Sequence, residues 1–497
     1  MKKKVYMLLL ALGTILLCSC QNQPVSESKS DGQTEEEENS VEIDLTGNSA
    51  ECTSKAVEVS EGKVRITDEG TYTLSGTLEG SVIIDASNTD KVELILKNAE
   101  INSADFAAIY VLSADKVTIT TEEETQNSLS NSGEYQNIDE NQVDGVVFSK
   151  ADLTLKGEGI LNIQASYGHG IVSKDELIFS SGTYDITAAS HGITGKDCVE
   201  ITGGAYSITA GKDGIHAENK DDSNLGYLHI GDGEFTINAG DDGIHSASQV
   251  MIAGGKVDIT NSYEGIEGLS IDVTGGDIQI TASDDGMNAA GGADGSSTGG
   301  KEEDIFAVTE GAYIQIAGGT VSVNASGDGL DSNGDLTISG GKTYVSGSQE
   351  GSNGAVDYNG KGTITGGIFA AAGASGMAQN FQEASTQGAI LISTEQQEAQ
   401  SSVVLYDSEG KELLNWQPLK AYSSVLVSCP EIKEDGTYQL SAGNSSSEIT
   451  MTGLIYGTEQ MQGGAMGERK APFEGGQMPE GQPGEPPEGQ DNRMPPA

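Results

Sequence analysis

Apolar and polar residues alternate in short runs along most of the chain. In Val199–Ile201 and again in Tyr206–Ile208 every second residue is apolar, and a pair of glycines separates the two runs. A period of two residues is typical of β-strands, and glycines between such runs permit a positive φ or a sharp bend. No window in these units shows the apolar stripe of a capped helix. The pattern predicts short strands joined by glycine-containing turns.

The paired runs belong to a repeat that ends in glycine. Seven copies align without gaps, at Leu177–Gly192, Val199–Gly214, Leu228–Gly243, Val250–Gly265, Ile271–Gly286, Ile314–Gly329 and Leu336–Gly351. A looser copy, Leu153–Gly170, precedes them, and most final glycines lie about 22 residues apart. Two longer gaps contain the insertions Asn219–Tyr227 and Gly291–Asp304.

The length of this repeat decides the fold class. A fixed period of about 22 residues indicates stacked units that bury apolar residues only against their neighbours. Each unit is too short for a strand and a crossover helix, so three short strands per coil are expected, which give an all-β, right-handed parallel β-helix. We expect it over residues 51–380, with Gly70–Thr121 as less regular early coils. Residues 381–456 break the period and predict a small β cap over the last coil.

Both ends of the chain differ from the repeats. Residues 1–20 read as an export signal, with three lysines, an apolar run and the lipobox spacing Leu17-Cys18-Ser19-Cys20. We expect Cys20 to carry lipid and to anchor the protein to the membrane at the cell surface, with plain secretion as the alternative. The acidic residues 21–50 and the Pro/Gly/Glu-rich residues 457–497 are expected to be a disordered tether and a disordered tail.

The formal net charge of −50 limits the possible partners. Nucleic acid is not expected, because phosphate backbones need a basic footprint. An acidic ligand would be repelled unless a cation mediates the contact. Multivalent cations are therefore candidate ligands.

Stacking of the repeats would arrange polar residues in columns. Equivalent positions lie over one another at the strand spacing of about 4.8 Å. The position before the final glycine then forms a first column, and the position two residues after that glycine forms a second. The first column is His169, His191, Asp213, Asp242, Glu264, Asp285, Asp328 and Glu350, and the second contains His216, His245, Glu267, Asn288 and Asp331.

The carboxylates of these columns suggest a calcium site. Like charges at this separation repel by about 1 kcal/mol per neighbour in water, whereas Ca²⁺ binds six to eight oxygens in loose geometry. The candidate metal ligands are Asp213, Asp241, Asp242, Glu264, Asp284, Asp285 and Asp328. The alternative is that Asp-Gly and Glu-Gly only turn the chain, which accounts well for aspartate and poorly for Glu264 and Glu350.

All five histidines fall in one part of the repeat region: His169, His191, His216, His229 and His245. A zinc site would need three or four of them to converge on one point. Because they occupy different columns and coils, stacked surface histidines are favoured, with His216 and His245 as neighbours. The candidate polysaccharide-binding residues are His216, His245, Lys196 and Asp197.

Catalysis is weighed against binding because parallel β-helices often host pectin-degrading enzymes. The strings "YGHG" and "GDDG" occur in the reverse of the order found in polygalacturonases, and no Arg-Ile-Lys element follows. A pectate lyase needs a base beside calcium, and all three arginines lie outside the repeats, which leaves Lys174, Lys196 and Lys212. No catalytic residue is assigned. Binding of an acidic polysaccharide through bridging calcium requires fewer special groups.

Several strings resemble bacterial carbohydrate-binding parallel β-helix lipoproteins, a family that includes a clostridial cellulose- and pectin-binding protein. They are "GTYTLSGTL", "KVTITTEEETQNSLS", "GIVSKDEL", "GITGKDCVEITGG", the "DGIH" repeats and "DGTYQL", and the similarity extends over about residues 57–443. The resemblance implies a calcium-containing helix related to polysaccharide lyases that binds plant cell-wall polymers. It marks Asp213, Asp242 and Asp285 as ligands, while His169 and His191 stand where acidic residues are expected.

These observations lead to one main hypothesis and two alternatives. The main hypothesis is a lipid-anchored, monomeric cell-surface protein that binds polysaccharide through a calcium-supported β-helix. The expected ligand is an acidic plant cell-wall polymer such as polygalacturonate or pectin, with cellulose as a further candidate. The first alternative is a calcium-dependent polysaccharide lyase. The second is a non-catalytic surface adhesin or spacer.

Overall fold

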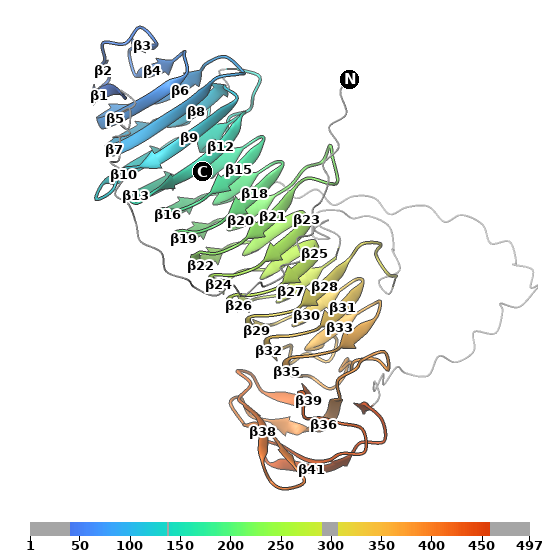
Figure 1. Cartoon of the computed structure of the whole chain (residues 1–497). Helices are drawn as coiled ribbons and strands as arrows, with labels where there is room; N and C mark the ends of the chain where they lie inside the picture. The colour runs from blue at the N-terminus through green and yellow to red at the C-terminus, as the bar shows by residue number, and fades with distance from the viewer. Residues whose placement is uncertain (1–39, 137–138, 291–306, 458–497) are drawn as a thin grey trace, which may run out of the picture. The chain divides into compact units, whose positions relative to one another are not determined.

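The computed structural model describes residues 40–136, 139–290 and 307–457, and every regular element in them is a β-strand (Figure 1). Across this described part of the chain, no helix is long and apolar enough to cross a membrane. The expected signal segment, most of the expected tether, the insertion Gly291–Asp304 and nearly all of the expected tail lie outside the described residues.

The strands form three parallel ladders, and each regular coil adds one strand to each ladder, which confirms the parallel β-helix. The first ladder runs through β1 (Val41–Gly47), β5 (Gly70–Glu79), β7 (Lys91–Ser103), β10 (Gln126–Asn131), β13 (Ile160–Ala165), β16 (Thr183–Ala188), β19 (Ala205–Ala210), β22 (Glu234–Ala239), β24 (Lys256–Asn261), β26 (Asp277–Ala282), β29 (Thr320–Ala325), β32 (Lys342–Ser346) and β35 (Ile368–Gly373).

The second ladder carries the candidate site described below. Its strands are β4 (Lys63–Ile66), β6 (Ser81–Asp85), β8 (Ile109–Ser113), β11 (Gly145–Ser149), β14 (His169–Ser173), β17 (Ile193–Gly195), β20 (Ile215–Ala217), β23 (Ile244–Ile252), β25 (Ile266–Val273), β27 (Met287–Ala289), β30 (Leu330–Ser332) and β33 (Val356–Tyr358).

The third ladder completes each coil. It includes the first halves of β5 and β7 and the second halves of β23 and β25. Its other strands are β9 (Lys116–Thr121), β12 (Asp152–Gly157), β15 (Glu176–Phe179), β18 (Cys198–Ile201), β21 (Tyr227–Ile230), β28 (Tyr313–Ile316), β31 (Asp335–Ile338) and β34 (Gly362–Ile364).

The core consists of apolar side chains stacked in register between coils. On the first ladder, Ile186 pairs with Ile208 and Ile208 with Ile237, and all three are essentially fully buried. Two residues before them in the chain, the rings of Tyr184, Tyr206 and Phe235 stack with centroid separations of 5.1 and 4.6 Å. Burial of this apolar surface, at about 25 cal/mol per Å², is the main stabilising contribution of each coil.

Glycines serve two purposes in the repeat. The second glycine of each Gly-Gly pair bends the chain, as at Gly204 (φ 113°) and Gly255 (φ 82°), where most other residues would be strained. The final glycine of the repeat has no positive φ, but a Cβ at Gly214 would lie 2.5 Å from Ile237 Cγ2 and 2.6 Å from Gly243 O. Close packing of coils, and not the turn, therefore requires glycine there.

Antiparallel strands flank the ladders at both ends. At the N-terminal end, β2 (Ala50–Glu51) pairs with β1, and β3 (Val57–Ser60) pairs with β4. At the other end, β39 (Tyr422–Ser428) lies between β35 and β36 (Ala389–Gln397), and β36 also pairs with β42 (Ile455–Tyr456). A second sheet has the order β38 (Glu412–Trp416), β37 (Val403–Asp407), β40 (Thr437–Ala442) and β41 (Ser445–Thr450). These C-terminal strands cover the exposed edge of β35, as an open stack requires.

The expected start of the β-helix at residue 51 is too late. Strand β1 already pairs with β5 in parallel over its full length, and its Ile43 and Leu45 are buried. The apolar alternation Val41, Ile43, Leu45 at the end of the acidic segment is the signal for this strand.

Candidate functional site: an acid–histidine row

The two polar columns lie side by side along the second ladder. Main-chain hydrogen bonds align the first column from coil to coil, because Gly192 N donates to Asp213 O, Gly214 N to Asp242 O and Gly286 N to Asp328 O at 2.9–3.0 Å. The second column occupies the outward-facing position of the strands, where His216 pairs with His245 and His245 with Glu267. Both columns therefore stack as the repeat predicts as far as Asp328 and Asp331.

The last coil departs from this register. Gly329 N donates to Gly354 O at 3.2 Å, so Gly354 takes the first-column place that the repeat assigns to Glu350. The placement of Glu350 in that column was wrong, because the coil contains extra residues before Gly354. In the second column, Asp331 pairs with Asp357, a residue missed by the sequence reasoning. The parallel between "DGLD" at 328–331 and "NGAVD" at 353–357 was the available signal.

The first-column side chains share a hydrogen-bonding role. Five of them accept from the main-chain N–H of the equivalent residue in the following coil. The contacts join His169 Nδ1 to His191 N (3.3 Å), His191 Nδ1 to Asp213 N (3.3 Å), Asp213 Oδ1 to Asp242 N (3.2 Å), Asp242 Oδ1 to Glu264 N (3.3 Å) and Asp285 Oδ1 to Asp328 N (2.6 Å). Histidine and aspartate interchange in this column because Nδ1 and Oδ1 are similarly placed acceptors.

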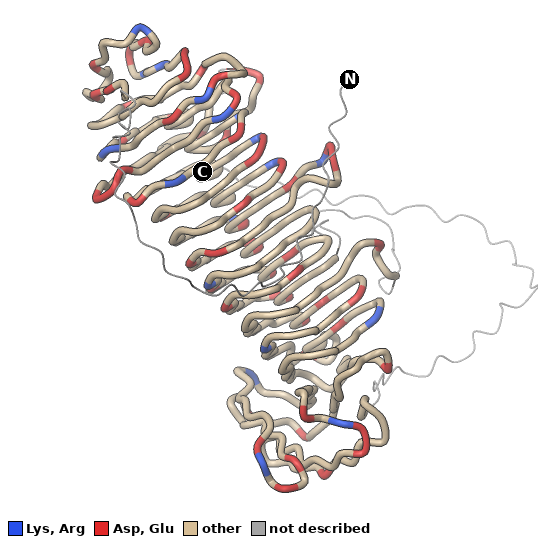
Figure 2. Tube along the Cα trace, in the orientation of Figure 1, with Lys and Arg blue, Asp and Glu red and all other residues tan. Residues whose placement is uncertain are grey.

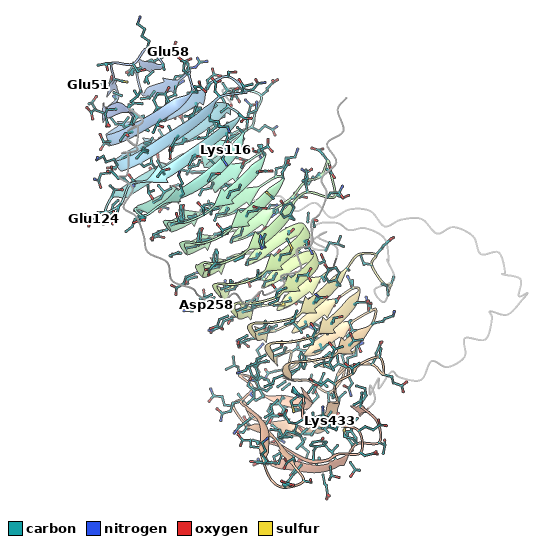
Figure 3. The ribbon with its side chains drawn as sticks, in the orientation of Figure 1. Glu51, Glu58, Lys116, Glu124, Asp258 and Lys433 are labelled. Carbon is teal, nitrogen blue, oxygen red and sulfur yellow. The ribbon has the colours of Figure 1, made fainter. Side chains whose placement is uncertain are left out.

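We call the two columns together the acid–histidine row, and it has two chemically different ends. The histidine end consists of His169, His191, Asp213 and His216. The carboxylate end consists of Asp285, Asp328, Asp331 and Asp357, and between them lie Asp242, His245, Glu264, Glu267 and Asn288. Figure 2 shows how acidic positions recur from coil to coil. Not every acidic residue of the coils belongs to the row: Asp258, labelled in Figure 3, lies on β24 of the first ladder.

At the histidine end, two rings converge on one buried carboxylate. Asp213 is 3% exposed, and its Oδ2 lies 3.0 Å from His191 Nδ1 and 2.7 Å from His216 Nδ1. Although burial opposes ionisation, the contacts of the Asp213 carboxylate with these two histidines hold its pKa well below the usual range. Burial likewise opposes protonation of His216, but its contacts with Asp213 and Glu218 raise the imidazole pKa.

Four histidine rings stack along the row, as expected for His216 and His245. The centroids are 5.0 Å apart for His169 and His191, 4.5 Å for His191 and His216, and 4.9 Å for His216 and His245. They are not simple surface groups, since His245 is 7% exposed and burial lowers the pKa of His169 to about 3. The fifth, His229, lies on the third ladder, outside the row.

The middle of the row combines one histidine with several carboxylates. His245 Nδ1 lies 2.6 Å from Glu267 Oε2 and 3.1 Å from Asp242 Oδ2, and these contacts outweigh burial and raise its pKa to about 11. Burial and nearby Glu267 raise the pKa of Glu264 to about 9. Among the described residues, the buried atoms Glu264 Oε2 and Asn288 Oδ1 have no hydrogen-bond partner. This stretch is thus rich in acceptor oxygens.

The carboxylate end concentrates negative charge without a basic side chain. Oxygens of Asp285, Asp328 and Asp331 lie within 4.8 Å of one another. Burial, reinforced by the neighbouring carboxylates, raises the pKa of Asp285 and Asp328 to about 7 and that of Asp331 to about 8. No lysine, arginine or histidine nitrogen of the described residues lies within 4.0 Å of these three carboxylates. The geometry suits a cation with oxygen ligands.

Two further candidate ligands lie immediately outside the first column. Asp241 and Asp284 each precede a first-column residue, and Tyr263 N donates to Asp241 O at 2.7 Å. The Asp284 carboxylate accepts a hydrogen bond from the Tyr263 hydroxyl, which helps to raise the tyrosine pKa to about 12. Its charge also raises the pKa of Asp285, Asp328 and Asp331. Asp284 is therefore part of the electrostatic environment of the carboxylate end.

The structure places Lys196 and Asp197 apart from the row. They form the turn between β17 and β18, where Lys196 Nζ lies 2.6 Å from Asp221 Oδ2 and Asp197 Oδ1 accepts from Asn219 Nδ2 at 2.7 Å. Both partners belong to the first insertion of the repeat. These two residues thus stabilise the inserted loop, whereas His216 and His245 belong to the row.

Comparison with known proteins identifies the family. A model of carbohydrate-binding domain-containing proteins matches residues 60–351. The chain belongs to this carbohydrate-binding family. A carbohydrate-binding domain-containing protein from Acetivibrio thermocellus is 31% identical over 135 residues, which are 27% of this chain and 47% of the relative. The chain thus spans about half the length of that curated relative.

A solved structure also shows similarity to this chain. It is described as the polysaccharide lyase-like protein from C. thermocellum, in a gadolinium derivative. The sequence identity is 30%, and the TM-score is 0.42. The match covers 48% of this chain and 93% of that one.

Proposed function

We propose that this protein binds an acidic polysaccharide, such as polygalacturonate, through calcium ions held at the carboxylate end of the row. Membership in a carbohydrate-binding family supports the class of ligand. The observation that carries the choice of an acidic polymer is the group Asp285, Asp328 and Asp331, three half-buried carboxylates without a basic partner among the described residues.

The proposal follows from charge and coordination chemistry. With one oxygen from each, the three carboxylates supply three of the six to eight ligands that Ca²⁺ binds, so other ligands must complete the shell. Asp357 and Asp284 lie beside the group, and water or a uronate carboxylate can fill the remaining positions. Because the chain carries a formal charge of −50, a polyanion would be repelled without such a bridge.

The buried oxygens of the preceding coils add support. Glu264 Oε2 and Asn288 Oδ1 are buried without a hydrogen-bond partner among the described residues, and Asn288 stacks on Asp331. A buried acceptor without a donor costs free energy, and a cation or its bound water would satisfy it. We therefore extend the proposed cation-binding stretch from Asp331 back to Glu264.

Two of the three lysines considered as bases for a lyase contact other groups. Lys196 pairs with Asp221 in the inserted loop, and Lys174 Nζ lies 5.2 Å from the centre of the Phe148 ring. No observation at the carboxylate end favours a proton-abstracting base, so we propose binding as the function.

Calorimetry of the purified full chain tests the proposal. Polygalacturonate and a neutral glucan are titrated separately, with calcium present and after chelation. We expect binding heat with polygalacturonate in calcium and none after chelation. Asp331→Asn should weaken this binding at least about tenfold, whereas Asp258→Asn, a matched change on the first ladder, should leave it unchanged.

Other outcomes of this experiment point to the alternatives. Binding heat measured with either polymer after calcium has been removed by chelation would contradict the calcium bridge. An increase in ultraviolet absorbance in the polygalacturonate mixture would reveal an unsaturated product and favour a lyase. If neither polymer produced heat, an adhesin or spacer would become the better account.

We also propose that lipid on Cys20 holds this binder at the cell surface. The support is the sequence of residues 1–20 alone. Metabolic labelling with a tagged fatty acid should mark the wild-type chain in membranes and leave Cys20→Ser unmarked. Labelling of both proteins would contradict the assignment.

A further inference from the structure

Three potential ligand atoms converge at the histidine end of the row. His191 Nδ1 and His216 Nδ1 lie 3.0 and 2.7 Å from the same oxygen, Asp213 Oδ2, and the ligand atoms of the three residues lie within 4.8 Å of one another. Neighbouring ligands of a metal bound at about 2.0–2.2 Å are themselves about 3 Å apart. The arrangement therefore has the dimensions of one side of a metal-coordination shell.

Sequence reasoning set this possibility aside because His191 and His216 occupy different columns. In the folded coil, however, the two columns interdigitate. His216 follows Asp213 by three residues and contacts it within one coil, while His191 reaches the same carboxylate from the preceding coil. Separation into columns thus does not keep the side chains apart.

His191 Nδ1 lies close to two atoms of Asp213. The main-chain nitrogen of Asp213 is 3.3 Å from it and the carboxylate oxygen Oδ2 is 3.0 Å from it. A metal ion bound by His191 Nδ1 and Asp213 Oδ2 would replace their direct contact with coordination.

The remaining atoms of the three side chains are fixed by other contacts. Asp213 Oδ1 accepts from Asp242 N at 3.2 Å, and His216 Nε2 faces Glu218 Oε2 at 3.8 Å. The His191 ring lies between the rings of His169 and His216. A carboxylate at the second nitrogen of a metal-binding histidine orients the ring and favours a lone pair at the coordinating nitrogen. Glu218 is placed to have this effect on His216.

We propose that His191, Asp213 and His216 bind a divalent transition-metal ion of the Zn²⁺ class, at a site separate from calcium at the carboxylate end. Two imidazoles and one carboxylate suit Zn²⁺, Ni²⁺ or Co²⁺, whereas Ca²⁺ prefers oxygen alone. Both rings are partly exposed, so water or an oxygen of a bound ligand can complete the shell. The row would thereby select two classes of cation along one stack of coils.

The competing explanation is that a histidinium–carboxylate ion pair needs no metal. The two explanations differ in what the metal-free protein binds. We would remove metals from the purified, untagged full chain by chelation and titrate Zn²⁺ calorimetrically, with zinc content measured after gel filtration. We expect a tight site that takes one ion. His191→Gln and His216→Gln should each weaken it at least about tenfold.

A matched variant and a spectroscopic measurement complete the test. His229→Gln removes an imidazole outside the row and should bind Zn²⁺ as the wild type does. A measurement on the wild type avoids any folding defect of the variants: X-ray absorption of Zn²⁺ bound to it should independently show two imidazole ligands. Absence of a tight site, or folded His191→Gln and His216→Gln proteins with wild-type affinity, would overturn the proposal.

A parallel calcium titration separates this inference from the proposed function. Asp331→Asn should reduce calcium binding and leave Zn²⁺ binding unchanged, while His216→Gln should do the opposite. Loss of both ions in either variant would show that the two sites are not separate.

Discussion

At the scale of single residues, the position before the final glycine of each repeat combines structure with chemistry. One atom of its side chain accepts the main-chain N–H of the next coil, as Asp213 Oδ1 does from Asp242 N. In an aspartate, the second oxygen is then directed toward the second column, where Asp213 Oδ2 contacts His216. A capping residue thus also supplies a row of ligand atoms, so turn chemistry and cation binding are not exclusive explanations of the Asp-Gly repeat.

The final glycine offers a sharp test of how closely the coils pack. A methyl group at Gly214 would collide with Ile237 and with Gly243 O, whereas a Cβ at Gly351, the formally equivalent residue of the last repeat, would meet no described atom within 4 Å. We expect Gly214→Ala to destabilise the protein by about 1–3 kcal/mol through overpacking. Gly351→Ala should leave the thermal unfolding midpoint nearly unchanged.

Differential scanning calorimetry of both variants makes this comparison. Gly214 has no positive φ, so backbone strain does not contribute to the expected effect. Equal midpoints for Gly214→Ala and the wild type would contradict the close approach of the coils at this corner.

At the scale of strands and coils, the repeat predicted most of the architecture because its period of two and its spacing both follow from coil geometry. The sequence could not reveal the register of the last coil, where Gly354 and not Glu350 stacks on Asp328. Nor could it reveal the convergence of His191 and His216, since a column argument gives the order of residues along the stack but not the directions of their side chains. The sequence also did not reveal that Lys196 and Asp197 contact the inserted loop through Asp221 and Asn219.

The register of the last coil leads to a prediction about calcium. Asp357 extends the second column beyond Asp331, whereas Glu350 lies outside both columns. If the carboxylate end binds Ca²⁺, Asp357→Asn should weaken the binding several-fold because one nearby negative charge is lost. Glu350→Gln removes the same formal charge outside the stack and should have little effect.

Isothermal titration of Ca²⁺ into the two variants decides between these positions. If Glu350→Gln weakened calcium binding more than Asp357→Asn did, the result would favour the register predicted from the repeat, in which Glu350 belongs to the first column, over the register in the structure. Equal small effects would place the ion closer to Glu264 than to Asp357.

At the scale of the whole molecule, the row makes stability depend on pH and on calcium together. Without metal, the pKa values of Asp285, Asp328 and Asp331 are raised to about 7, 7 and 8, above about 3.9 for an unfolded aspartate. Between about pH 4 and pH 8 the folded state therefore holds protons that the unfolded state has released. Stability falls with rising pH wherever the folded state binds more protons, so the chelated protein should become less stable across this interval.

Calcium should reverse this trend at its upper end. Protons compete with Ca²⁺ for the same carboxylates, so the ion should stabilise the protein strongly at pH 8 and little at pH 5. We expect the unfolding midpoint of the chelated protein to be lower at pH 8 than at pH 5. Added calcium should raise this midpoint mainly at pH 8. In the chelated double variant Asp328→Asn/Asp331→Asn, the unfolding midpoint should fall less between pH 5 and pH 8 than in the chelated wild type. Added calcium should change the midpoint of this variant little. Comparison of the double variant with the wild type separates the effect of the carboxylate end from that of other titrating groups. One of these is His169, whose lowered pKa makes stability rise with pH below about pH 6. A pH dependence identical in the double variant and the wild type would show that the carboxylate end does not control it.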